Sequence, residues 1–180
     1  PGWLQILDPK ARCNLNIDLP AIAPELISEK AALSQLSEEY FQNYCRLIAD
    51  PIAQHWTVTT STFSDDQLLA WLRSRPGQSG RLDWAILNPD TGEFLGEIVL
   101  NELDSEAASM NLRIALLSSI AGQGIGSQAV QLVVDYGFQV LRLAQIRLDV
   151  WSENHRAIRV YEKNGFVLHS SIIEDGKEFL

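Results

Sequence analysis

A chain of 180 residues, 46% hydrophobic and 21% charged, has the length and composition of one globular domain and excludes extensive disorder. Its formal net charge of -9 argues against nucleic acid as a partner, because an excess of Lys and Arg is needed to neutralise a phosphate backbone. The apolar runs are too short to cross a membrane and the two cysteines lack zinc-ligand spacing, so we expect a reduced, cytoplasmic protein without a membrane partner.

The first half of the chain predicts one strand followed by two helices. Residues 26–36 alternate loosely between apolar and polar side chains, which favours an early strand. Ser37 and the two glutamates after it predict the start of a helix, which ends near Ala49 because Pro51 disfavours helix at the residue before it. Ser64 and the two aspartates after it open a second, shorter helix.

In the second half, strands first form a hairpin and later alternate with helices. A Pro-Asp turn with a following glycine joins the two hairpin strands. The predicted elements are strands 82–87, 94–100, 109–117, 146–150 and 166–173, and helices 127–141 and 154–164, the last ended by Gly165. This order predicts an α+β protein, a mixed α/β sandwich in which helices flank one central sheet.

A glycine-rich loop separates strand 109–117 from helix 127–141. Gly122, Gly124 and Gly126 remove side chains where backbone N–H groups could meet an anion at the start of a helix, which favours phosphate binding. A tight strand-to-helix turn with positive φ would explain the same glycines without a ligand.

The same loop also imitates a dinucleotide-binding pattern. Residues 124–129 fit G-x-G-x-x-A, and Asp149 follows about 20 residues later, near the end of a strand. One helix and one strand remain after Asp149, whereas a doubly wound nucleotide-binding domain needs several more strand–helix units. An NAD-type dinucleotide-binding protein therefore stands as an alternative.

Three segments together resemble the GNAT superfamily of N-acetyltransferases, in particular its ribosomal-protein N-terminal acetyltransferase-like branch. They are the loop AGQGIGSQAV, the strand RLDV and the segment ENHRAIRVYEKNGF. The resemblance implies a mostly antiparallel, splayed sheet with a V-shaped cleft between strands 109–117 and 146–150, and acetyl-CoA as the cosubstrate. It covers roughly residues 27–173. We therefore expect an acetyltransferase domain over residues 26–180 and an N-terminal extension over residues 1–25, in which residues 10–19 could add a strand or an arm.

The resemblance also assigns cofactor-binding roles by position. Loop amides would hold the pyrophosphate at a helix N-terminus, and the strand before the loop would hydrogen-bond the pantetheine arm. Asn154 matches a position whose amide reaches that arm, and it could equally cap its helix. Ala121 replaces the Arg or Gln that is usual in the family, so we expect weaker cofactor binding. The implied cofactor-binding residues are Ile114, Ala115, Leu116, Gln123, Gly124, Ile125, Gly126, Ser127 and Asn154.

Acetyl transfer from a thioester to an amine requires a base for the amine and an acid for the departing thiolate. Tyr161 matches the family's general acid, although packing of its helix on the sheet would also explain this residue. Asn111 falls where many relatives carry a strand glutamate, so we assign the base to Glu97, with Glu102 and Asp83 as the other candidates.

The implied acceptor is an amine-bearing small molecule or the N-terminus of a peptide or protein, and the branch favours the α-amino group. Relatives close with one more strand, for which residues 177–180 remain, so this strand is very short, supplied by a partner in a homodimer, or lost. No metal site is expected, because His55, His155 and His169 lack ligand spacing. A catalytically inactive acyl-CoA-binding regulatory module is the third interpretation.

Overall fold

A computed structural model describes residues 3–9, 17–57, 62–174 and 176–180. The strands of its main sheet are β1 (Trp3–Leu7), β2 (Leu26–Ile27), β3 (Ala32–Gln35), β4 (Leu82–Leu87), β5 (Phe94–Asp104), β6 (Ser109–Leu116), β7 (Gln145–Leu148) and β8 (Val167–Ser170). They lie in the order β2-β3-β4-β5-β6-β7-β1-β8, and β6 and β7 pair in parallel while the other neighbours pair antiparallel. The predicted α+β class with a mostly antiparallel sheet is confirmed.

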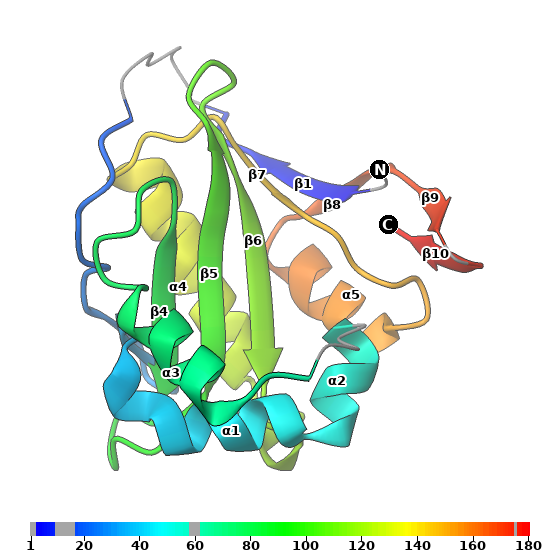
Figure 1. Cartoon of the computed structure of the whole chain (residues 1–180). Helices are drawn as coiled ribbons and strands as arrows, with labels where there is room; N and C mark the ends of the chain where they lie inside the picture. The colour runs from blue at the N-terminus through cyan, green and yellow to red at the C-terminus, as the bar shows by residue number, and fades with distance from the viewer. Residues whose placement is uncertain (1–2, 10–16, 58–61, 175) are drawn as a thin grey trace.

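Helices cover both faces of this sheet (Figure 1). One face packs against α4 and α5, and the other packs against α1 and α3. The helices are α1 (Phe41–Ala49), α2 (Pro51–Thr57), α3 (Asp65–Arg73), α4 (Ile125–Gln139) and α5 (His155–Lys163), with short 3-10 turns η1 (Glu38–Tyr40) and η2 (Ser118–Ile120). The layers therefore form the sandwich that the order of elements predicts.

Strand β4 shows how alternation builds the two cores. Trp84 is fully buried on the α4 face, where its ring meets that of Tyr136 edge-on with centroids 6.0 Å apart. The next residue, Ala85, points to the opposite face and joins the cluster of Tyr44 from α1 and Leu72 from α3. Each face of the sheet thus has its own apolar core.

Several predicted elements form as expected. The hairpin of β4 and β5 is confirmed, and β5 extends four residues beyond the predicted strand, to Asp104. Ser64 and Gln67 make a reciprocal capping box at the start of α3. Helix α5 ends before Gly165, whose φ of 90° is strained for residues with a side chain.

Two predictions in the first half need correction. Residues 26–36 form a hairpin rather than one strand, because the Ser28 hydroxyl bonds the backbone of Ala31 and closes a turn between β2 and β3. The helix that ends at Ala49 is followed at once by α2, which was not predicted. Asp50 caps it by accepting the amides of Ile52 and Ala53, and proline is well tolerated at a first helical position.

Two predictions in the second half also change. Helix α4 starts two residues earlier than predicted, because Gly124 adopts φ 84° and serves as its N-cap. Residues 166–173 are split between β8, which pairs with β1, and β9 (Ile172–Glu174), which pairs with β10 (Lys177–Phe179) in a separate two-stranded sheet. Residues 177–179 thus do form a short strand, as one of the three alternatives for the closing strand expects.

The N-terminal segment contributes a strand for which the sequence carries no clear signal. β1 lies between β7 and β8 and pairs antiparallel with both, so it joins two strands that are otherwise not neighbours. Residues 10–16 of the proposed arm lie outside the described residues, and residues 17–19 have no regular structure.

In the described part of the chain, no helix is long and apolar enough to span a membrane.

Candidate active site

The sheet opens between β6 and β7. Their parallel pairing covers residues 109–111 of β6 and 145–147 of β7, and the two strands then diverge (Figure 1). Beyond this point, β6 has no strand partner on that side among the described residues. An unpaired strand edge offers N–H and C=O groups to an extended chain, as the predicted pairing of Ile114, Ala115 and Leu116 with a pantetheine arm requires.

The glycine-rich loop lies beside this edge. The first amides of α4 have no acceptor within the helix and are left for a ligand or water. A Cβ atom at Gly126 would lie 2.9 Å from Cδ1 of Leu116, so the first turn of α4 lies close to β6 and the Leu116 side chain would have to shift to admit a larger residue. The loop and the strand edge thus fit a cofactor with a pyrophosphate and an extended arm.

Helix α5 carries the predicted general acid. Tyr161 is 7% exposed and packs on Phe166, with ring centroids 5.9 Å apart. Burial raises the pKa of Tyr161 to about 12, so the phenol keeps its proton at neutral pH. At the start of the helix, Asn154 accepts the amide of Ala157 at 3.1 Å, so the cap role is observed. Its second predicted role, a contact with the pantetheine arm, stays a prediction.

A polar contact ties α5 to the glycine-rich loop. The Asn164 amide donates to the Ser127 hydroxyl at 3.1 Å and to the Val160 carbonyl at 2.8 Å. Asn164 is 9% exposed, so this bridge is buried. It holds the end of the helix that bears Tyr161 against the first turn of α4.

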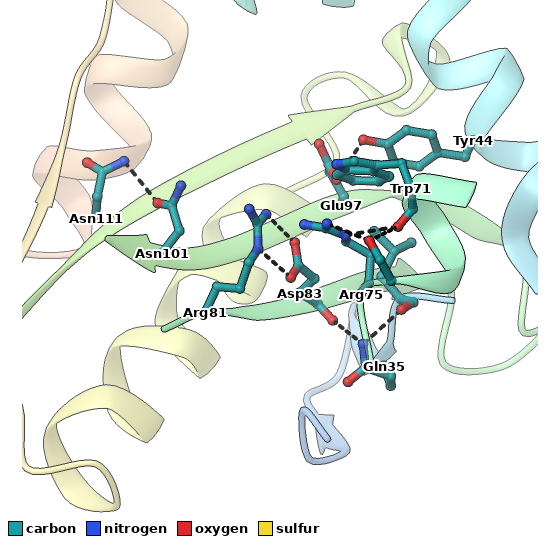
Figure 2. Close-up of polar contacts among 11 residues, drawn as sticks. Gln35, Tyr44, Trp71, Arg75, Arg81, Asp83, Glu97, Asn101 and Asn111 are labelled. Atoms are coloured by element: carbon teal, nitrogen blue, oxygen red, sulfur yellow. Dashed lines mark hydrogen bonds and ion pairs between the residues drawn. The ribbon is translucent and has the colours of Figure 1, made fainter. Parts of the chain in front are cut away.

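The predicted base, Glu97, lies on the α1 and α3 face of the sheet, in register with Ala115 of β6. A Cβ at Gly96 would lie 2.2 Å from the Ala115 carbonyl oxygen, so glycine is needed to let β5 and β6 approach here. The Tyr44 hydroxyl donates to Oε2 of Glu97 at 3.0 Å (Figure 2). Desolvation raises the pKa of Glu97, and the Tyr44 hydrogen bond and the Arg113 charge oppose that shift.

Arg75 and Arg81, which are drawn in Figure 2, interact electrostatically with Glu97. Arg81 forms an ion pair with Asp83, which is 1% exposed, through Nε at 2.8 Å and Nη2 at 2.5 Å. Arg75 is 6% exposed, its Cζ lies 4.3 Å from the centre of the Trp71 ring, and its Nε donates to the Trp71 carbonyl. Within the described part of the chain, Nη1 of Arg75 is buried without a hydrogen-bond partner.

The other candidates for the base are less suited. Asp83 already has its carboxylate engaged by Arg81. Glu102 is exposed, with a φ of 54° at a break in the β5–β6 register. Asn111 pairs in register with Asn101 and donates to its side-chain oxygen at 3.3 Å, so this position holds a neutral amide bridge (Figure 2).

Aromatic rings join α2 to the segment after β7. The centre of the Trp151 ring lies 5.4 Å from that of Trp56 and 5.1 Å from that of His55.

The other two histidines lie elsewhere in the fold: His155 is exposed at the start of α5, and His169 stacks on Trp3. The described residues contain no cluster of three or more potential metal ligands. Burial raises the pKa of the Cys45 thiol, which disfavours the reactive thiolate.

Sequence reasoning missed four residues that shape this region. Tyr44 and Arg75 reach the Glu97 face from α1 and the end of α3, Asn164 binds Ser127, and Lys30 from the β2–β3 turn reaches the glycine-rich loop. Tyr44 and Glu97 are 53 positions apart, so no local pattern connects them. Asn164 alone had a signal, since it lies within the segment that carries the family resemblance.

Comparison with known proteins identifies the family. The model of the acetyltransferase (GNAT) domain matches residues 31–167. Spermidine N(1)-acetyltransferase of Escherichia coli (strain K12) is 32% identical over 84 residues, 47% of this chain, and the chain spans only 45% of that relative's length. The uncharacterized N-acetyltransferase p20 of Bacillus licheniformis is 27% identical over 146 residues, which cover 78% of this chain and 81% of p20.

A solved structure confirms the fold. The crystal structure of spermidine N-acetyltransferase from Vibrio cholerae in complex with CoA and spermine superposes with a TM-score of 0.77 at 19% identity, over 84% of this chain and 93% of that one. The family match includes both the glycine-rich loop and α5, so the dinucleotide alternative is set aside. The chain therefore belongs to the GNAT acetyltransferase family.

Proposed function

We propose that this protein transfers an acetyl group from acetyl-CoA directly to the α-amino group of a peptide or protein. The proposed catalytic domain is residues 26–180 together with β1 of the N-terminal extension, which pairs with β7 and β8. The observation that carries the proposal is the register of Glu97 with Ala115. It sets a carboxylate of raised pKa across from the strand segment assigned to the pantetheine arm, which ends in the thioester.

Glu97 acts as the general base. Its carboxylate, directly or through a water molecule, accepts a proton from the amine as the nitrogen forms a bond to the thioester carbonyl carbon. A base works best when its pKa lies near the working pH, and desolvation moves the pKa of Glu97 in that direction. Tyr44 donates to the carboxylate and holds it in place.

Tyr161 acts as the general acid. As the carbon–sulfur bond of the thioester breaks, the phenol donates its proton to the departing sulfur. The raised pKa of Tyr161, about 12, keeps the phenol protonated until that step. Amides of Gln123, Gly124, Ile125, Gly126 and Ser127 hold the pyrophosphate, and no residue of the chain becomes covalently acetylated.

The charges near Glu97 favour a peptide N-terminus over a polyamine as the acceptor. Arg75, Arg81 and Arg113 all contribute to the electrostatics of Glu97 or its neighbours, and one N–H group of Arg75 is buried without a partner in the described residues. Guanidinium groups bind carbonyl and carboxylate oxygens, which a peptide carries beside its α-amine. A polyamine has no such oxygen and is repelled by clustered cations.

Spermidine is the second candidate acceptor, because it appears in the names of relatives that match this chain. The net charge of -9 also favours a cationic substrate over long distances. The two candidates differ in what surrounds the amine, so the same enzyme preparation can distinguish them.

CoA release measured with a panel of acceptors tests the proposal. Peptides with a free α-amine should exceed spermidine in kcat/KM by about tenfold or more, the scale expected when buried donors lose their partners. The same peptides with a blocked N-terminus and a free lysine serve as controls and should be poor acceptors. A preference for spermidine, or for the lysine side chain, would overturn the α-amine assignment.

A further inference from the structure

We infer that Lys30, in the turn between β2 and β3, binds the pyrophosphate of acetyl-CoA and supplies the positive charge that Ala121 does not. The inference rests on acetyl-CoA as the cosubstrate of the family, but not on Glu97, Tyr161 or the identity of the acceptor.

The first observation is the place of Lys30 against the glycine-rich loop. Its Nζ donates to the carbonyl of Gln123 at 3.4 Å. A Cβ atom at Gly124 would lie 3.8 Å from both Cδ and Nζ of Lys30, so the lysine side chain lies across the residue that caps α4. The ammonium group is therefore next to the amides assigned to the pyrophosphate.

The second observation is that the backbone holds Lys30 in this place. Its amide donates to the side-chain oxygen of Gln128, in the second turn of α4, at 2.8 Å. The Ser28 hydroxyl donates to the Ala31 carbonyl at 3.0 Å and accepts the Ala31 amide at 3.2 Å. These two hydrogen bonds close the turn. A residue 93 positions before Gln123 is thus held against the loop and α4 by two hydrogen bonds, one from its Nζ and one from its amide.

The third observation concerns charge. A chain with net charge -9 repels a polyanionic cofactor at long range, so attraction has to come from local groups. The loop contains no Lys or Arg of its own, and its first position, Ala121, lacks the Arg or Gln usual in the family. Neither ion pair found among the described residues involves Lys30. Its ammonium can exchange the neutral carbonyl of Gln123 for a phosphate oxygen, a stronger partner.

Titration calorimetry with CoA, dephospho-CoA and pantetheine tests the inference without any acceptor. Lys30→Met should weaken CoA and dephospho-CoA about tenfold each, the scale of one charged hydrogen bond, and should leave pantetheine unchanged. Lys30→Arg should bind CoA like the wild type. The matched control is Arg142→Met, which removes an exposed cation beyond the far end of α4, roughly 20 Å from the loop for a helix of this length.

Three results would overturn the inference. The first is an unchanged CoA affinity in Lys30→Met. The second is a loss of affinity for CoA but not for dephospho-CoA, which would assign the lysine to the 3′-phosphate. The third is an equal loss of CoA affinity in Arg142→Met. Ala121→Arg adds a further test. It should restore CoA affinity to Lys30→Met while tightening the wild type by a smaller factor, because one cation then substitutes for the other. A failure of the proposed Glu97 or Tyr161 chemistry would leave all of these binding results unchanged.

Discussion

Glu97 is the residue whose chemistry depends most on its surroundings. Desolvation raises its pKa, so folding makes the carboxylate harder to ionise than it is in the unfolded chain. A raised carboxyl pKa costs stability as pH rises above the unfolded value of about 4.3, and this cost is present at neutral pH. The shift that suits Glu97 to its proposed role as base therefore destabilises the fold.

Glu97→Gln should separate these two effects. Activity should fall about 10²- to 10⁴-fold, the usual contribution of a general base, while the Tm at pH 7 stays equal or rises because the amide needs no ionisation. In the wild type, kcat/KM should rise with pH through a pKa above the ordinary value for glutamate. Glu102→Gln, at an exposed site, is the matched control and should change neither quantity. A large drop in Tm would show that Glu97 has a structural role.

Tyr161 should leave its mark on the alkaline side of the pH profile. Because burial raises its pKa to about 12, the acid form persists and the wild-type rate should not decline between about pH 8 and 10, where an ordinary tyrosine begins to ionise. Tyr161→Phe should lower kcat about 10²-fold or more without weakening CoA binding. Full activity in a correctly folded Phe variant would remove Tyr161 from the mechanism.

At the scale of elements, Asp50 joins three parts of the chain that flank the site. One carboxylate oxygen caps α2, and the other accepts the amide of Ser118, just after β6, at 2.9 Å. The Ser118 hydrogen bonds are the main reason that the pKa of Asp50 is lowered to about 2. A lowered carboxyl pKa stabilises the fold above its unfolded value, and that stabilisation disappears as pH falls through about 2.

Asp50→Asn should therefore lower the Tm at pH 7 by about 2–4 °C, the shift expected for roughly 1 kcal/mol in a domain of this size. The difference from the wild type should persist at pH 5 and shrink as pH falls from about 4 toward 2, where the wild-type carboxylate also becomes neutral. Thermal unfolding followed by circular dichroism at a series of pH values measures this. A difference independent of pH would mean that charge is not the cause.

What the sequence predicts about elements follows from local signals. The helix start at Ser64 and the glycine after α5 carry their information within a few residues, and the structure confirms both. The turn at Ser28 depends on a side-chain bond that interrupts an apparently continuous alternation, so residues 26–36 were misread as one strand. The Tyr44–Glu97 bond joins α1 to β5, and no periodicity reports such a contact.

At the scale of the whole molecule, β1 completes the sheet. Leu4 is 2% exposed and lies opposite Leu148 of β7 and Leu168 of β8, so it joins the two parts of the sheet. Five residues are too few to produce a distinct pattern, so the sequence does not predict this strand. The strand supports β7, which forms one side of the opening between β6 and β7.

Leu4→Asp should destabilise the protein by about 3 kcal/mol or more, since it removes buried apolar surface and introduces a carboxylate without a partner. Leu7→Asp, at the exposed end of the same strand, is the control and should change stability by about 0.5 kcal/mol or less. Urea unfolding measures both. Equal stability of the two variants would contradict the placement of β1 between β7 and β8.

The central claim is direct acetyl transfer from acetyl-CoA to an α-amine, and mass spectrometry after a single turnover tests it most directly. The protein is mixed with acetyl-CoA alone and then with a peptide that has a free N-terminus. The enzyme should remain unmodified until the peptide is added, and the acetyl group should then appear on the peptide's α-nitrogen as CoA is released. An acetylated enzyme before the peptide is added, or CoA release without an acetylated α-amine, would contradict the proposed reaction.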